Sequence, residues 1–252
     1  MSAERNSSMK KIIRRQYRAS LKSEINEIAF LQAANQSKQE ACAARKNDKV
    51  LTCGMFRYKR MVFLYMELII DDVPPILDDK HRIIDDKNPI IVDQYPIIDD
   101  PSIWFPKLTE FLCKWPQMDK EKEWVEMFPV FWFDSPVSIE QWKRKQNPDK
   151  RCGRIAVLYP DKLLSYICHH QAIAQEGLLK GDRYQSIAVH ENILFSYFET
   201  PRDREVVNIK RVDEKSSEID KWKNVDPVSH FHHFPEANGD DFMIISTVFD
   251  IG

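Results

Sequence analysis

Two short segments decide the fold of this chain: Val62-Phe63-Leu64-Tyr65-Met66-Glu67 and Leu194-Phe195-Ser196-Tyr197-Phe198-Glu199. Both contain the pattern Phe-x-Tyr-x-Glu, in which aromatic and other side chains alternate. Such alternation is typical of a half-buried β-strand, because successive side chains point to opposite faces. An Arg-Tyr pair precedes each segment, Arg57-Tyr58 in the first half and Arg183-Tyr184 in the second. We therefore interpret each half as carrying a hairpin, and the two hairpins as copies of one unit.

The surroundings of the two hairpins repeat as well. Residues 20–45 contain no Gly or Pro and are rich in helix formers, and Pro160 opens a second helix that Gly177 can end. A strand is predicted before each helix and at the end of each half: Lys11–Arg14, Arg154–Val157, Val130–Asp134 and Thr247–Asp250. This order predicts an α+β fold of tandem duplicated ferredoxin-like units, residues 1–150 and 151–252, which form an intramolecular barrel-like sheet pair.

An acidic stretch interrupts the first copy at residues 69–100. A motif of two or three apolar residues followed by aspartate recurs there every seven residues, but four prolines exclude a continuous helix. We expect an extended, turn-rich insertion with its isoleucines against the sheet and its aspartates in water. Oxygen ligands would suit calcium, yet the spacing of a calcium-binding loop is missing, which favours a solvated loop.

Composition limits the possible functions. Hydrophobic residues make up 43% of the 252 residues, enough for a sizeable core. Charged residues make up 30% with a net charge of −2, so we expect neither a nucleic-acid nor a membrane partner. Five scattered cysteines without zinc spacing indicate a reducing, cytoplasmic location. No glycine-rich phosphate-binding motif occurs, which argues against nucleotide-dependent chemistry.

The histidines carry the chemical signal. Five of the seven lie in two clusters of the second half, His169-His170 and the group His230, His232 and His233. In the predicted fold both clusters flank one sheet, and we expect them to meet at its concave face. Tyr166 and His170 are four residues apart on one helical face. Because imidazole titrates near neutrality, this pair is a candidate acid/base pair. The alternative is a core tyrosine beside a half-exposed histidine.

From about Cys152 to Ile251 the chain resembles the L-rhamnose mutarotases of the dimeric α+β barrel superfamily. Five matching segments occur in the family's order: Tyr166-Ile167-Cys168-His169-His170, Tyr184-Gln185-Ser186-Ile187, Ile193-Leu194-Phe195-Ser196-Tyr197-Phe198-Glu199, Asp226-Pro227-Val228-Ser229-His230-Phe231-His232-His233 and Thr247-Val248-Phe249. The first copy resembles the family only weakly. The positions that match Tyr166 and His170 are expected there near Ser23 and Glu27, which predicts an inert, degenerate copy.

The resemblance implies the site residues. His170 would be the catalytic acid/base at the anomeric carbon, and the sugar would be held by Tyr166, Tyr184, His232 and His233. The resemblance also implies neither a metal nor a cofactor. His232 and His233 stand where the family has paired tryptophans, and Ile173-Ala174-Gln175 stands where it has Trp-Pro-Glu. The expected ligand is therefore a small monosaccharide, L-rhamnose or a related sugar.

Three functions remain open on the sequence alone. The first is a cofactor-free sugar mutarotase, an isomerase with one active site in an intramolecular pseudo-dimer. The second is a non-catalytic duplicated barrel that binds a small carbohydrate or another ligand. The third is metal binding by His170, His230, His232 and His233, since imidazole is a common metal ligand. Whether the fused pair dimerises further is also open.

Overall fold

The computed structural model describes residues 9–72, 100–116, 120–178, 182–202 and 215–252. Most of the acidic stretch, residues 73–99, lies outside the described residues, so its expected conformation stays a prediction. Its first residues, Ile69 to Asp72, continue a strand of the sheet and pair with Met9 to Ile12. The insertion therefore begins after this strand, later than the sequence indicated.

The first half contains eleven helices and strands among the described residues. They are β1 (Met9–Ser20), α1 (Glu27–Lys46), β2 (Val50–Tyr58), β3 (Met61–Asp72), α2 (Pro101–Trp104), α3 (Pro106–Thr109), β4 (Trp115–Pro116), β5 (Glu121–Lys122), β6 (Val125–Glu126), β7 (Phe128–Trp132) and α4 (Ile139–Trp142).

The second half has a similar order of main elements, with three short 3-10 turns between them. It contains β8 (Lys150–Leu158), α5 (Leu163–Glu176), β9 (Ser186–His190), β10 (Ile193–Thr200), α6 (Ser217–Asn224), β11 (Phe231–His232) and β12 (Met243–Ile251).

Local signals explain the helix ends. The side chain of Asn26 caps α1 by accepting a hydrogen bond from the Ala29 amide at 3.1 Å. The expected start of this helix at Ser20 is wrong, because β1 pairs with β3 along its whole length and includes Ser20. The expected end of α5 is confirmed: Gly177 adopts the left-handed conformation (φ 71°) that favours glycine.

The two Arg-Tyr pairs occupy different places. Arg57-Tyr58 ends β2, directly before the hairpin turn to β3. Arg183-Tyr184 lies before β9, and the hairpin turn of the second half is Glu191-Asn192. The two pairs are therefore not equivalent: β3, which contains the first motif, follows Arg57-Tyr58 directly, whereas β9 lies between Arg183-Tyr184 and β10, which contains the second.

Ten of the described strands form one continuous antiparallel sheet, in the order β6-β1-β3-β2-β12-β8-β10-β9-β7, with β11 paired to β8 beside this order. The short strands β4 and β5 form a separate pair. The first part of β12 pairs with β8, and its second part crosses to β2 in the other half. In the same way β6 pairs with β1, and β7 crosses to β9. Only Met127 separates β6 from β7, so the sheet curls into a nearly closed barrel. The sequence predicted a pair of facing sheets, whereas the structure has a single sheet in which exchanged strands join the two halves.

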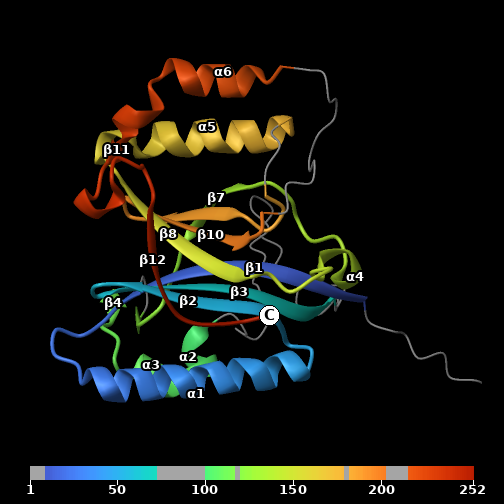
Figure 1. The fold of residues 1–252 in the computed structure, drawn as a ribbon, viewed down its shortest axis with the longest axis vertical. Helices are drawn as coiled ribbons and strands as arrows, with labels where there is room; N and C mark the ends of the chain where they lie inside the picture. Colours follow the sequence, from blue (N-terminus) through green and yellow to red (C-terminus); the bar gives the residue numbers. More distant parts are fainter. Residues whose placement is uncertain (1–8, 73–99, 117–119, 179–181, 203–214) are drawn as a thin grey trace, which may run out of the picture.

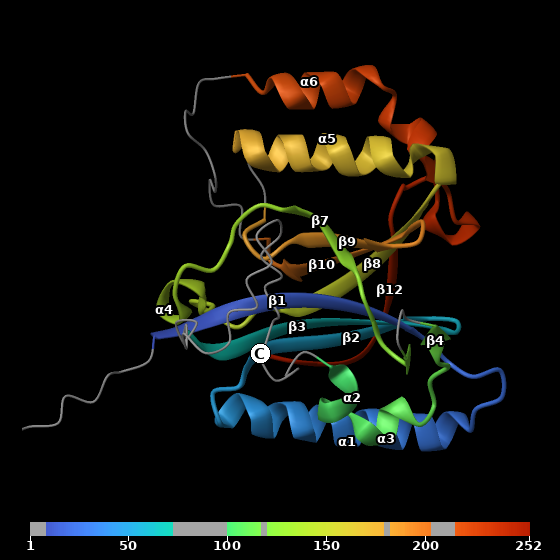
Figure 2. The ribbon, with the colours of Figure 1, turned by 180° about the vertical axis from the view of Figure 1, so that it is seen from behind.

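Helices cover the barrel on two opposite sides. Figures 1 and 2 show α1, α2 and α3 along one side and α5 and α6 in layers on the other. Each helix layer packs on the outer face of the sheet and buries aromatic side chains there, such as Phe30 of α1 and Tyr166 of α5. In the described part of the chain, no helix has the length and apolarity needed to cross a membrane.

The repeated Phe-x-Tyr-x-Glu motifs meet inside the barrel. The rings of Tyr65 and Tyr197 stack at 3.7 Å with an angle of 3° between their planes, and Phe63 stacks on Phe195 at 5.1 Å. All four side chains are fully buried. Stacked aromatic rings bury a large apolar area and add favourable ring contacts. The pattern that indicated the fold therefore also builds its centre.

The two glutamates of the motifs share one arginine. Arg144 follows α4, and its Nη2 donates to Glu67 Oε1 at 3.0 Å and to Glu199 Oε1 at 2.7 Å. Tyr65 and Tyr197 each donate a hydrogen bond to the glutamate two residues later, both at 2.6 Å. Burial would raise the pKa of Glu67, but the charge and hydrogen bonds of Arg144 hold it below its usual value. This network closes one end of the barrel.

Candidate functional site

Tyr166 and His170 lie together on α5, as their spacing predicts. Their rings stack at 3.8 Å, and only 1% of Tyr166 is exposed. His170 Nδ1 lies 2.9 Å from the Tyr166 carbonyl oxygen. Because a carbonyl can only accept, Nδ1 carries the proton and Nε2 is the unprotonated nitrogen of a neutral ring. The described residues supply no hydrogen-bond partner for Nε2.

An aromatic enclosure surrounds His170. The ring centroid of Trp222, on α6, lies 4.9 Å from that of His170, and the centroid of Phe131, on β7, lies 5.8 Å away. Burial lowers the pKa of His170 to about 4, so the imidazole is neutral at neutral pH. Burial also raises the pKa of the Tyr166 phenol, which therefore keeps its proton. The pair presents a free nitrogen and a protonated hydroxyl group.

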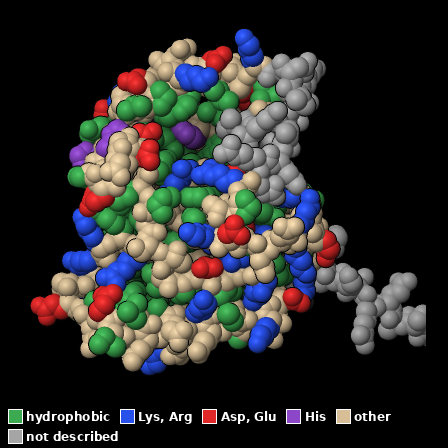
Figure 3. Space-filling model, viewed as in Figure 1, with side chains coloured by type: hydrophobic (Ala, Val, Ile, Leu, Met, Phe, Trp, Pro, Cys, Tyr) green, Lys and Arg blue, Asp and Glu red, His purple; other side chains and the backbone are tan. Residues whose placement is uncertain are grey.

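A recess is visible between the helix layer and the sheet. In Figure 3 a histidine side chain lies in this recess, above a band of lysine and arginine side chains. Arg154 projects from β8 toward the α5 side of the sheet, where its guanidinium lies 4.5 Å from the ring centroid of Phe242. Its Nε donates to Ser196 Oγ at 3.3 Å. Burial lowers the pKa of Arg154, but an arginine remains charged at neutral pH.

The other expected site residues lie elsewhere. Tyr184 is buried at the closed end of the barrel, where the Arg144 guanidinium lies 3.9 Å from its ring centroid. His232 is exposed, and its ring lies 5.8 Å from that of Tyr159. His233 Nε2 donates to Asp241 Oδ1 at 2.9 Å. The structure therefore brings Tyr166 and His170 together and does not bring these three residues to them.

The six histidines within the described ranges are not arranged for metal binding. His230 is buried: its Nδ1 donates to the Asp226 carbonyl oxygen at 3.2 Å, and its Nε2 accepts from Ser165 Oγ at 3.0 Å. Both ring nitrogens are thus occupied. Across the residues that the structure describes, no group of three or more His, Cys, Asp or Glu side chains could hold a metal ion.

The first half lacks this pair. Aligning the first residues of α1 and α5 places Phe30 opposite Tyr166 and Ala34 opposite His170, and the buried faces of the two helices then coincide. The expected positions Ser23 and Glu27 are wrong, because Ser23 precedes the helix and Glu27 is its first residue. Phe30 and Ala34 offer no titratable group.

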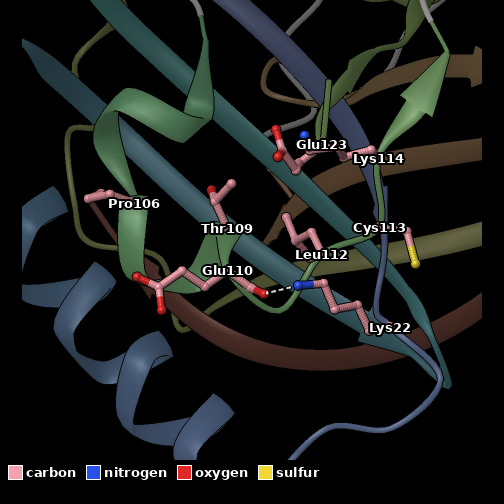
Figure 4. Close-up of a pocket in the computed structure, with 8 residues that line it drawn as sticks. All are labelled: Lys22, Pro106, Thr109, Glu110, Leu112, Cys113, Lys114 and Glu123. Carbon is pink, nitrogen blue, oxygen red and sulfur yellow. Dashed lines mark hydrogen bonds between the residues drawn. The ribbon is translucent and has the colours of Figure 1, made fainter. Parts of the chain in front are cut away.

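A separate cavity of about 430 Å³ lies beside α3 and β4 (Figure 4). Lys22 and Lys114 line it together with Glu110 and Glu123, so its charges balance. Lys22 Nζ donates to the Glu110 carbonyl oxygen at 2.6 Å, and the sulfur of Cys113 points away from the other lining side chains. This cavity offers neither an acid/base pair nor an excess of one charge.

Comparisons with known proteins give no family for the chain. No family model and no curated protein matches it. Among solved structures it is similar to a putative monooxygenase from Lactobacillus acidophilus (8% identity, TM-score 0.39, 95% of each chain covered). It is also similar to a putative monooxygenase from Fusobacterium nucleatum (9%, 0.40, 95% of this chain and 94% of that one) and to an anthrone oxidase-like protein (8%, 0.37, 95% of each). These values support no argument about activity.

Proposed function

We propose that the second half is a cofactor-free, mutarotase-like isomerase that interconverts the anomers of a small monosaccharide, L-rhamnose or a related sugar. The observation that carries this proposal is the hydrogen bond from His170 Nδ1 to the Tyr166 carbonyl oxygen, which leaves Nε2 as a neutral base. An aromatic enclosure around the base suits the apolar face of a sugar ring. The resemblance of the sequence to the mutarotases supplies the reaction.

The reaction needs only proton transfers. His170 Nε2 would take the proton of the anomeric hydroxyl and pass it to the ring oxygen as the bond between that oxygen and the anomeric carbon breaks. The open-chain aldehyde would then rotate and close on the other face, with the protons returned. The Tyr166 hydroxyl would donate a hydrogen bond to the sugar. Positioned acid/base groups accelerate such steps by about 10²–10⁴-fold.

A second candidate function is binding without catalysis. A general base is most effective when its pKa lies near the working pH, and a pKa of about 4 makes His170 a weak base at neutral pH. The same enclosure could therefore hold a small carbohydrate or another ligand and leave it unchanged.

Saturation-transfer NMR on L-rhamnose and other anomerising sugars tests the proposal. We expect enzyme-dependent exchange between α and β anomers that His170→Ala abolishes. His169→Ala is the matched control, because it removes the neighbouring imidazole of the same helix and should leave exchange unchanged. Binding without faster exchange would favour the second candidate. Exchange that survives in His170→Ala would refute the assigned base.

We infer that the two halves arose by tandem duplication and work as an intramolecular pseudo-dimer with one site. The shared element order, the paired motifs and the symmetrical exchange of terminal strands support this. All five cysteines are unpaired, which supports the expected cytoplasmic location. We expect neither a nucleic acid nor a membrane as partner, and size measurement in solution would tell whether the pseudo-dimer pairs further.

A further inference from the structure

The face of the sheet beneath α5 carries a polar cluster of three residues: Arg154, Ser196 and Gln185. Arg154 and Ser196 lie opposite each other in the pairing of β8 with β10. Both face α5, because Ala156 and Leu194, two positions along these strands, belong to the core beneath that helix. Arg154 Nε donates to Ser196 Oγ at 3.3 Å, and Nη2 lies 3.1 Å from the side-chain amide of Gln185, whose oxygen accepts this bond. The two groups that hold the guanidinium are therefore neutral.

Arg154 differs from the other arginines in the interior because it has no counter-charge. Four arginines with side chains only 8–9% exposed each have a carboxylate oxygen within 3.4 Å, and they are Arg18, Arg144, Arg151 and Arg183. In the part of the chain that the structure describes, Arg154 has no carboxylate partner and its Nη1 has no acceptor. Arg154 is partly exposed, and Nη1 is not among the enclosed atoms. A largely buried cation without a counter-charge points to an anion that comes from outside the chain.

The Tyr166 hydroxyl group lies near this cation and is also without a partner. Tyr166 is 1% exposed, yet its hydroxyl makes no hydrogen bond within the described ranges. Burial raises the pKa of this phenol, and the charge of Arg154 is the largest influence that opposes the rise. The rings of Phe231 and Phe242 link the two residues: the centroid of Phe231 lies 5.7 Å from that of Tyr166, and the Arg154 guanidinium lies 4.5 Å from that of Phe242. Buried polar groups rarely stay unpaired, so both groups suit one ligand in the recess of Figure 3.

The first half provides an internal comparison for this cluster. Three residues before the glutamate of each Phe-x-Tyr-x-Glu motif stand Leu64 and Ser196, and their partners on the neighbouring strands are Tyr17 and Arg154. Tyr17 and Leu64 are buried in the hydrophobic core beneath α1. The half that lacks the acid/base pair therefore also lacks the cation beneath its helix. The cation is not needed to build this fold, which favours a role in ligand binding.

We propose that Arg154 binds a carboxylate group of the substrate, which makes the substrate an acidic monosaccharide, a uronic acid. This proposal rests on the anomer exchange proposed at His170. Arg154 Nη1 would donate to a carboxylate oxygen, and the Tyr166 hydroxyl would donate to a neighbouring oxygen of the sugar. The charges of Asp182 and Asp240 also act on Arg154, so its surroundings suit a single negative charge better than a dianionic phosphate.

The test compares D-glucuronate and D-galacturonate with their neutral parents, D-glucose and D-galactose. NMR titration of the full chain would measure the affinity for each sugar, and saturation transfer would measure anomer exchange. At least one uronate should bind about tenfold more tightly than its neutral parent, because a charge-assisted hydrogen bond is stronger than a neutral one. Arg154→Gln should remove this preference, whereas Arg154→Lys keeps the charge and should retain part of it. Added salt should reduce the preference in the unmodified chain.

Arg57→Gln is the matched control. It removes a guanidinium that pairs with Glu27 in the first half, and it should leave the preference for the uronate unchanged. The melting temperatures of the variants would show that each one folds.

The outcomes distinguish this proposal from the proposed isomerase activity. A preference for a uronate that is lost in Arg154→Gln and kept in Arg57→Gln supports the carboxylate site, even if no sugar shows faster anomer exchange. Faster exchange of neutral sugars, with no preference for either uronate, supports the isomerase and overturns the role of Arg154. A preference that survives in Arg154→Gln, or no binding of either uronate at millimolar concentration, also overturns it. Glucose 6-phosphate that binds more tightly than glucuronate and depends on Arg154 would overturn the carboxylate assignment.

Discussion

The change from Arg144 to alanine would test the network that closes the barrel. Arg144 donates to both glutamates of the repeated motifs, and the side chains of Glu67 and Glu199 are 0% and 4% exposed. The variant removes the cation that the two buried carboxylates share and leaves Glu199 with the longer contact to Arg151 Nε at 3.8 Å. Each carboxylate keeps a tyrosine donor, and Glu67 also keeps the indole N–H of Trp142 at 2.9 Å. The expected effect is a large loss of stability with the fold retained.

The magnitude follows from the burial of the network. Breaking a buried ion pair by removing one partner costs about 3–5 kcal/mol, because the remaining charge has lost its compensation. The hydrogen bonds that remain on both carboxylates place the expected loss near the lower end, about 3–4 kcal/mol. Acidification that protonates one carboxylate relieves their repulsion, so the deficit relative to the unmodified chain should shrink as the pH falls.

Urea unfolding, followed by tryptophan fluorescence at several pH values, measures this loss. Lys107→Ala is the control: it breaks an exposed ion pair with Glu110 at 3.2 Å and should change stability by less than about 0.5 kcal/mol. Adding Glu67→Gln to Arg144→Ala should restore part of the lost stability. A loss below about 1 kcal/mol, or a deficit that does not depend on pH, would refute the electrostatic account of the network.

Three further predictions concern single residues. Burial lowers the pKa of His170 to about 4, whereas the same imidazole in the unfolded chain has a pKa near 6.5. Acidification between these pH values should therefore lower the free energy of unfolding by up to about 3 kcal/mol, because the unfolded chain binds the proton first. His170→Gln should flatten this part of the pH profile measured by urea unfolding. Gly153→Ala places a Cβ 2.5 Å from the ring of Phe56 and should cost about 1–3 kcal/mol in thermal unfolding, and an unchanged melting temperature would contradict the close packing. Exposed Cys168 should react first with a thiol reagent, whereas Cys53, whose thiol pKa is raised by burial, should react only on unfolding. A fast reaction that persists in Cys168→Ser would contradict the assignment of the reactive thiol to Cys168.

Local patterns predicted the strands at the centre of the fold. The alternation in Phe63-Leu64-Tyr65 and its counterpart near Tyr197 indicated strands with one buried face, and these residues do meet in the barrel. The exchange of β7 and β12 between the halves was not predicted, because pairing between residues so far apart in the chain leaves no local signal. The start of α1 was placed too early for the same reason, since the pairing of β1 with β3 extends the strand to Ser20.

The sequence predicted only the part of the candidate site that lies on one helix, α5. The four-residue spacing of Tyr166 and His170 placed both on one face of α5, which the structure confirms. Trp222, which completes the enclosure, comes from α6, and its position depends on tertiary packing. The order of the segments in the sequence gave no information about where Tyr184 lies in the barrel. Its backbone carbonyl accepts a hydrogen bond from Arg14 at the far end of the barrel.

The strand exchange has a consequence for any attempt to dissect this chain. A cut between α4 and β8 would yield one fragment in which β2 has lost its neighbour β12, and another in which β9 has lost β7. Each fragment would expose an unpaired strand edge and be prone to aggregation. Only the two fragments together could restore the ring, so the halves should fold and unfold as one cooperative unit.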